Sequence, residues 1–182
     1  MLLIAVIDDD FGFKAKLENM LNTIKGKDDV VHTYSDGDSF LSAFRTKPYD
    51  LIFLDACMPG IDGLDVAKEL REISQSTLIV VVTEHLNYAP DFFQFNVFRF
   101  ILKPPEKSAL RQALADARSE SEKIRNETLL IKSKGITRKI YYKEILFFES
   151  SHNRIVIHTV GEIYTTNTPL REFERMLSAI KT

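Results

Sequence analysis

The stretch DLIFLDACMPGIDG, residues 50–63, decides the fold class of this chain. Four consecutive apolar residues, 51–54, are typical of a strand that is buried on both faces. A carboxylate, Asp55, follows directly, and Pro59 and Gly60 then indicate a sharp turn. In open α/β sheets, functional groups lie beyond the carboxyl ends of the strands. The position of Asp55 therefore indicates both a parallel sheet and a site at its edge.

The same strand and helix alternation recurs through the first part of the chain. Between the strand-like runs, apolar residues follow helical spacing. We therefore predict an α/β fold with a five-stranded, doubly wound parallel sheet that is covered by helices on both faces. The predicted strands are residues 2–7, 30–34, 51–54, 78–82 and 99–102.

Polar residues end four of these strands and form a candidate site. Asp8 and Asp9 follow the first strand, and the third, fourth and fifth strands end at Asp55, Thr83 and Lys103. Carboxylates that converge repel one another unless a hard cation neutralises them, and Mg²⁺ prefers oxygen ligands of this kind. Taken singly, the aspartates at 8–10 are also typical of a helix cap or a solvent-facing loop, Lys103 of a solvated surface charge, and Thr83 of an ordinary β-branched strand residue. Together they offer acids for Mg²⁺, an aspartate nucleophile, and a hydroxyl and an ammonium for phosphoryl oxygens.

The first part of the chain resembles the receiver domain of bacterial two-component response regulators. The resemblance rests on VIDDD (6–10), LDACMPGIDG (54–63), VVVTEH (80–85) and FILKPP (100–105). It implies a flavodoxin-like fold and a sensor histidine kinase as partner. It also implies that the protein is not a metabolic enzyme, because Mg²⁺-dependent phosphoryl acceptance and slow self-dephosphorylation are its only chemistry.

The resemblance also implies which residues accept the phosphoryl group and hold the metal ion. Asp55 would be the phosphorylated residue. Asp8, Asp9, Asp55 and the backbone carbonyl of Cys57 would hold Mg²⁺, so the Cys57 side chain need not react. A haloacid-dehalogenase-type phosphatase also uses a strand-end aspartate, but the sequence DDDFG at residues 8–12 departs from that family's Asp-x-Asp-x-Thr or Asp-x-Asp-x-Val pattern.

Further residues of the resemblance would transmit the phosphorylation signal. Thr83 and Lys103 would contact the phosphoryl group, and Phe100 would repack as the aromatic switch residue. The Lys103–Pro104 peptide bond would be cis. The surface formed by the fourth helix, fifth strand and fifth helix would then make a phosphorylation-dependent homodimer. Glu84 departs from the family, in which the residue after the switch threonine is usually small.

The second part of the chain has a different pattern. Residues 119–127, SESEKIRNE, are polar and compatible with a helix, and the following apolar residues alternate with period two. The segments 138–159 and 162–177 resemble the start of a LytTR-type DNA-binding domain. We therefore expect a receiver at 1–118, a helical linker at 119–127 and a smaller, mainly β module at 128–182.

The resemblance places DNA contacts in the turn that begins at Ser151, with His152, Asn153 and Arg154 as the candidate donors to phosphates or base edges. The later half of that family's pattern has no match before Thr182, so the module is expected to be truncated. An alternative therefore stays open. The chain would then be a receiver-only interaction module or phosphate sink without specific DNA binding.

Charge and composition agree with two modules in a cytoplasmic protein. Residues 1–127 carry a net charge of −6, and residues 128–182 carry +4, which suggests different partners. A single cysteine excludes an internal disulfide. The apolar runs are shorter than the ~18 residues of a membrane span, and no basic segment precedes the first run as in a signal peptide.

Overall fold

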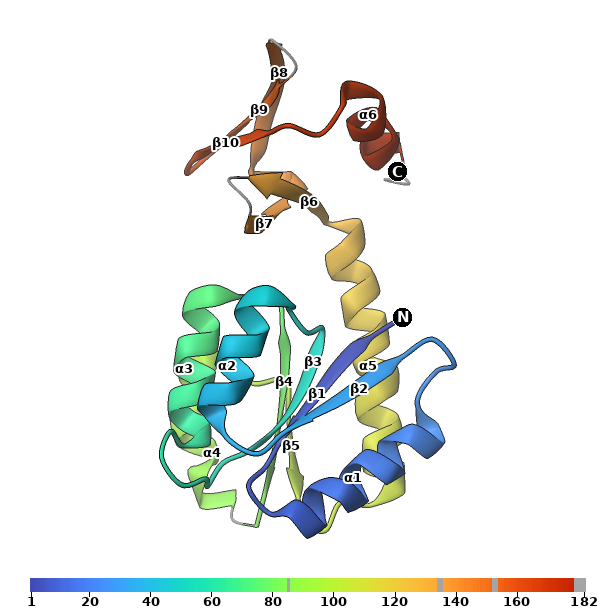
Figure 1. Ribbon diagram of the computed structural model, residues 1–182, viewed down its shortest axis with the longest axis vertical. Coiled ribbons are helices and arrows are strands. Elements are labelled where there is room, and N and C mark those ends of the chain that lie inside the picture. Colours follow the sequence, from blue (N-terminus) through green and yellow to red (C-terminus); the bar gives the residue numbers. More distant parts are fainter. Residues whose placement is uncertain (85, 134–135, 152–153, 179–182) are drawn as a thin grey trace. The chain divides into compact units, whose positions relative to one another are not determined.

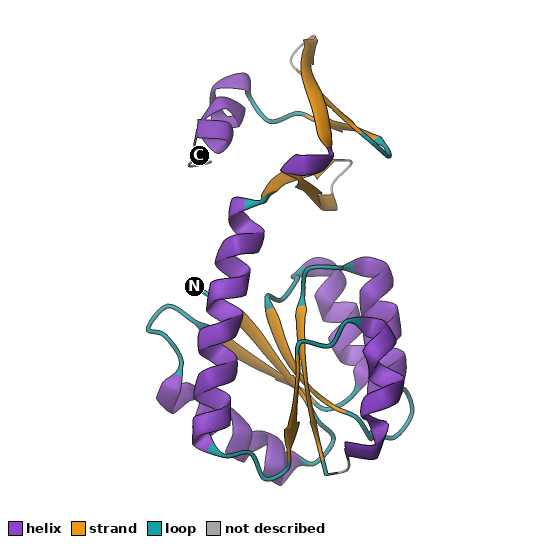
Figure 2. Cartoon of the chain, turned by 180° about the vertical axis from the view of Figure 1, so that it is seen from behind, coloured by secondary structure: helices purple, strands orange, loops and turns teal. Residues whose placement is uncertain are grey.

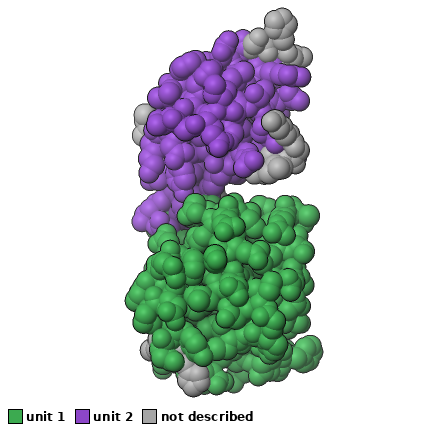
Figure 3. All heavy atoms as spheres, turned by 90° about the vertical axis from the view of Figure 1, so that its left-hand side faces the viewer, with its two compact units in different colours: residues 1–119 green, residues 120–182 purple. Residues whose placement is uncertain are grey.

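The computed structural model describes residues 1–84, 86–133, 136–151 and 154–178. The chain forms two compact units, residues 1–119 and 120–182 (Figure 3). Each unit has its own cluster of buried apolar side chains.

A five-stranded parallel sheet forms the centre of the first unit, in the order β2-β1-β3-β4-β5. Its strands β3 and β4 are buried along their whole length, as expected of a sheet that is covered on both faces. All five predicted strands are present, which confirms the predicted fold class. Their bounds are β1 (Leu3–Ile7), β2 (Val30–Tyr34), β3 (Leu51–Asp55), β4 (Leu78–Thr83) and β5 (Arg99–Leu102).

Helices cover both faces of this sheet (Figures 1 and 2). One face carries α1 (Phe11–Ile24) and α5 (Lys107–Asn126); the other carries α2 (Gly37–Thr46), α3 (Gly63–Ile73) and α4 (Ala89–Phe92). An aspartate side chain accepts first-turn amide hydrogen bonds at the start of each of α1, α2 and α3. These caps fix where the helices begin, and thus the length of the loops that carry the site.

The fourth helix, α4, is the shortest α-helix of the first unit. It has four residues and lies between two 3₁₀ turns, η1 (Leu86–Tyr88) and η2 (Phe93–Phe95). Asn96, with φ of 48°, ends the segment in the left-handed region. Among the aromatic residues of this segment, Phe92 is buried, whereas Phe93 is 71% exposed.

The second unit is mainly β, as predicted. A two-stranded sheet consists of β6 (Thr128–Ser133) and β7 (Ile136–Tyr141). The 3₁₀ turn η3 (Tyr142–Glu144) leads into a three-stranded antiparallel sheet of β8 (Ile145–Ser151), β9 (Arg154–Thr159) and β10 (Ile163–Thr166). The helix α6 (Leu170–Ser178) follows. The two sheets and α6 share one core, whose buried members are Leu129, Ile131, Ile140, Ile155, Ile157 and Phe173. None of the helices in the described part of the chain is long and apolar enough to cross a membrane.

Candidate functional site

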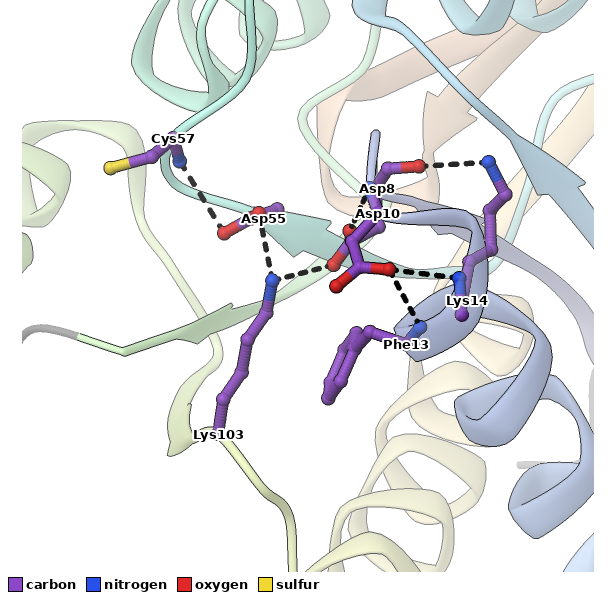
Figure 4. Close-up of polar contacts among 8 residues, drawn as sticks. Asp8, Asp10, Phe13, Lys14, Asp55, Cys57 and Lys103 are labelled. Carbon is purple, nitrogen blue, oxygen red and sulfur yellow. Dashed lines mark hydrogen bonds and ion pairs between the residues drawn. The ribbon is translucent and has the colours of Figure 1, made fainter.

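The candidate site lies at the carboxyl edge of the parallel sheet. Parallel pairing of β1, β3, β4 and β5 brings the ends of these strands to the same edge. Asp8, Asp55 and Thr83 are all buried there, whereas Asp9 is exposed. Figure 4 shows Asp8, Asp55 and Lys103 pointing toward one another. Sheet order thus brings together residues from strands that are up to 95 positions apart (Asp8 to Lys103).

Lys103 joins the two buried carboxylates. Its Nζ lies 2.7 Å from Asp8 Oδ2 and 2.8 Å from Asp55 Oδ2. The same ammonium stands over the Phe13 ring, 4.4 Å from its centroid, which is a cation–π contact. The sequence predicted the position of Lys103 at this edge, but not that it bridges both acids.

The electrostatics follow from having two buried acids and one partly buried cation. Burial raises the pKa of Asp55, and repulsion from Asp8 adds to the effect, although Lys103 acts in the opposite direction. Burial by itself would lower the pKa of Lys103, but the hydrogen bonds to Asp55 and Asp8 outweigh it and raise the pKa. The site therefore holds excess negative charge that attracts a further cation.

The acidic residues fit a small divalent cation. One carboxylate oxygen from each of Asp8, Asp9 and Asp55 lies within 4.8 Å of the other two. All three donors are hard oxygen ligands, and one of the three residues is exposed, so water can complete the coordination shell. This donor set suits Mg²⁺ better than a soft metal ion.

Two supporting residues were missed by sequence reasoning. Lys14, from α1, is buried, and its Nζ donates hydrogen bonds to the Asp8 carbonyl (2.9 Å) and to Ser35 Oγ (2.7 Å). Gly63, at the start of α3, donates its N–H to the Ala56 carbonyl at 3.1 Å, and a Cβ at this position would lie 2.1 Å from the Asp55 carbonyl oxygen. Glycine is therefore needed for α3 to approach β3 this closely.

The remaining predicted receiver residues lie around this centre. The Cys57 N–H donates weakly to Asp55 Oδ1 (3.4 Å), and the Cys57 side chain is exposed. Phe100 is half-buried and packs edge-on against Phe92 and Phe93. Glu84 is exposed. The cis peptide bond at Lys103–Pro104 confirms that prediction.

The predicted DNA contacts are only partly described. Arg154 is exposed at the start of β9, where it pairs with Ser151 of β8. His152 and Asn153 lie outside the described residues. The structure thus describes one of the three candidate residues.

Comparisons with known proteins agree with both halves of this description. A model described as the response regulator receiver domain matches residues 4–115, and one described as the LytTr DNA-binding domain matches residues 136–181. The transcriptional regulatory protein LytR of Staphylococcus aureus is 26% identical over 95% of this chain and 76% of its own length. The positive alginate biosynthesis regulatory protein of Pseudomonas aeruginosa is 26% identical over 94% and 75%.

Solved structures match the first unit. The response regulatory domain of protein mrkE from Klebsiella pneumoniae has a TM-score of 0.61 and 25% identity, covering 67% of this chain and 99% of that domain. The response regulator protein TrrA from Thermotoga maritima, solved in complex with Mg(2+)-BeF, has a TM-score of 0.58 and 27% identity, covering 64% and 99%.

Proposed function

The chain belongs to the response regulator receiver family and carries a LytTr DNA-binding module after its receiver, and from this premise we propose that phosphorylation of Asp55 controls DNA binding by the second module. The transcriptional regulatory protein LytR and the positive alginate biosynthesis regulatory protein are both regulatory proteins by name, which agrees with a regulatory rather than a metabolic role. The observation that carries the proposal is Asp55 itself, buried at the edge of the sheet beside Lys103 and two further carboxylates.

The proposed chemistry is phosphoryl transfer from a sensor histidine kinase. An Asp55 carboxylate oxygen attacks phosphorus, the bond from phosphorus to the donor's imidazole nitrogen breaks, and the imidazole leaves with the electron pair. Asp8, Asp9, Asp55 and the Cys57 carbonyl would hold Mg²⁺, which supplies positive charge to the phosphoryl oxygens. Hydrolysis of the acyl phosphate by water returns Asp55 to its free form.

The proposed switch follows from the added charge. A phosphoryl group brings roughly one to two further negative charges and new acceptor oxygens. The Lys103 ammonium, which now neutralises Asp8 and Asp55, is drawn toward these oxygens, and the Thr83 hydroxyl donates to them. Movement of the segment after β4 lets Phe100 repack against its α4 neighbours. This would alter the α4–β5–α5 surface, where we propose homodimer formation.

We further propose a division of labour along the chain. Residues 1–118 receive the phosphoryl group, residues 119–127 connect as a helix, and residues 128–182 supply the DNA surface. His152, Asn153 and Arg154 would donate to DNA, and the net charge of +4 in this module favours a polyanion. We place the protein in the cytoplasm, where a promoter and a kinase are both accessible.

The test is selection from random duplex DNA at fixed salt, with and without acetyl phosphate and Mg²⁺. The salt concentration must be fixed because basic segments bind DNA of any sequence when the salt concentration is low. We expect a paired motif that is enriched more strongly with the phosphodonor. Asp55→Asn should abolish both stoichiometric phosphorylation and this enhancement, whereas Asp38→Asn, an exposed aspartate of α2, should change neither.

The outcomes separate the possible functions. Stoichiometric labelling of the Asp55→Asn variant would refute the assignment of the phosphoacceptor. Intact phosphorylation without any enriched sequence would instead favour a receiver that acts through a protein partner or as a phosphate sink.

A further inference from the structure

A cavity of about 520 Å³ lies beside the phosphoacceptor strand, between the loop that follows β3 and the η1–α4 segment. Its apolar lining includes Met58, Pro59 and Phe92, and two of these side chains, Met58 and Phe92, are themselves buried. The volume lies within the range of roughly 300–1,000 Å³ that is typical of small-molecule sites.

The charged side chains that line this cavity are all negative. Asp62, at the start of α3, and Asp91, in α4, both line it, and no lysine, arginine or histidine is among its lining residues. Within the described part of the chain, neither carboxylate has an ion-pair partner; Asp62 accepts only the capping hydrogen bond from the Asp65 N–H, at 2.9 Å. The Tyr88 ring, which is 36% exposed, also lines the cavity and offers a π face.

We propose that this cavity binds a small organic cation with an aromatic or aliphatic body. The apolar lining would take the body, and the two carboxylates would take the ammonium or amidinium group. An organic cation gains from the face of an aromatic ring as well as from carboxylates, and Tyr88 supplies that face. A neutral ligand of the same shape would form no ion pair with Asp62 and Asp91, and an anionic one would be repelled by them.

The walls of the cavity also connect it to the phosphoacceptor. Ala56 and Cys57 directly follow Asp55, and the opposite wall belongs to the segment that follows Thr83. A ligand that bridges the walls would hold them in one arrangement, so ligand and phosphoryl group would change each other's affinity by the same factor. Binding itself does not depend on the proposed function, whereas this coupling does.

Binding is tested with tryptamine as the cationic probe and tryptophol, its hydroxyl analogue, as the neutral one. Both are titrated into the full ¹⁵N-labelled chain without phosphodonor, and amide shifts are followed by NMR. We expect saturable shifts in the millimolar range or below for tryptamine, confined to the β3–α3 loop, the start of α3 and α4. Tryptophol should bind about tenfold more weakly, since two partly exposed charge pairs are lost.

Variants locate the charge that is responsible. Asp62→Asn and Asp91→Asn should each weaken tryptamine and leave tryptophol unchanged, and asparagine preserves the cap of α3. Asp65→Asn, an exposed aspartate of the same helix that does not line the cavity, is the matched control. Equal binding of the two probes, the absence of saturable shifts, or shifts that lie elsewhere would overturn the proposal. For the coupling, the tryptamine titration is repeated with acetyl phosphate and Mg²⁺; unchanged affinity in a chain shown to be phosphorylated would overturn only the coupling.

Discussion

Asp29 connects three segments of the receiver unit through hydrogen bonds. Its buried carboxylate accepts hydrogen bonds from the Leu2 N–H (2.7 Å), the Gly26 N–H (2.8 Å) and Arg118 Nη2 (2.7 Å), and thereby ties the starts of β1 and β2 to α5. Burial by itself raises the pKa of Asp29, but the guanidinium and the two amides outweigh it and lower the pKa from 3.8 to about 2.

We expect Asp29→Asn to lower the free energy of unfolding of this unit by about 2 kcal/mol at pH 7. A pKa unit corresponds to about 1.4 kcal/mol, and we round downward because the Arg118 side chain is partly exposed to screening solvent. The folded-state pKa lies below the unfolded one, so the stabilisation is complete above pH 3.8 and is lost as the pH falls toward about 2. Asparagine does not ionise, so the difference between the two proteins should shrink to about half by roughly pH 3.

The assay is urea unfolding of the full chain at pH 7 and near pH 3, followed by circular dichroism, with hydrogen exchange of β1 and β2 amides to assign the transition. Asp28→Asn is the matched control, because Asp28 is the exposed neighbour. Two results would refute the reasoning. One is a stability of Asp29→Asn equal to that of Asp28→Asn at pH 7, and the other is a deficit that stays undiminished at the lower pH.

Three further changes test the site and the output module. Gly63→Ala places a Cβ 2.1 Å from the Asp55 carbonyl oxygen. It should therefore destabilise the first unit by more than about 1 kcal/mol and reduce labelling by acetyl phosphate. Normal labelling and stability would show that α3 can move away freely. Glu84→Ala should change the lifetime of the phosphorylated protein, measured by loss of label after removal of the donor; an unchanged rate would mean that this exposed carboxylate points away. Arg154→Ala should weaken binding to the selected DNA by about tenfold, as expected for one lost contact, in a gel-shift titration at fixed salt, and equal affinity would exclude it from the interface.

The sequence by itself determined the layout of the receiver. Uninterrupted apolar runs at residues 51–54 and 78–82 are typical of strands that are covered on both faces, and the structure has β3 and β4 buried along their whole length. Because strand ends in a parallel sheet share an edge, Asp8, Asp55 and Lys103 could be placed together from their positions alone. The change to period-two alternation likewise indicated the β-rich second module.

The partners of these residues depend on tertiary structure. Three contacts join different elements of the fold. Lys103 bridges Asp8 and Asp55. Lys14 donates to the Asp8 carbonyl, and Gly63 lies against the backbone of Asp55. Local hydrophobic periodicity reports which face of an element is buried, but not what lies opposite. The four-residue α4 and the acidic cavity beside it are equally invisible in the periodicity. The cavity depends on the distance between the loop after β3 and the segment after β4, which local periodicity does not report.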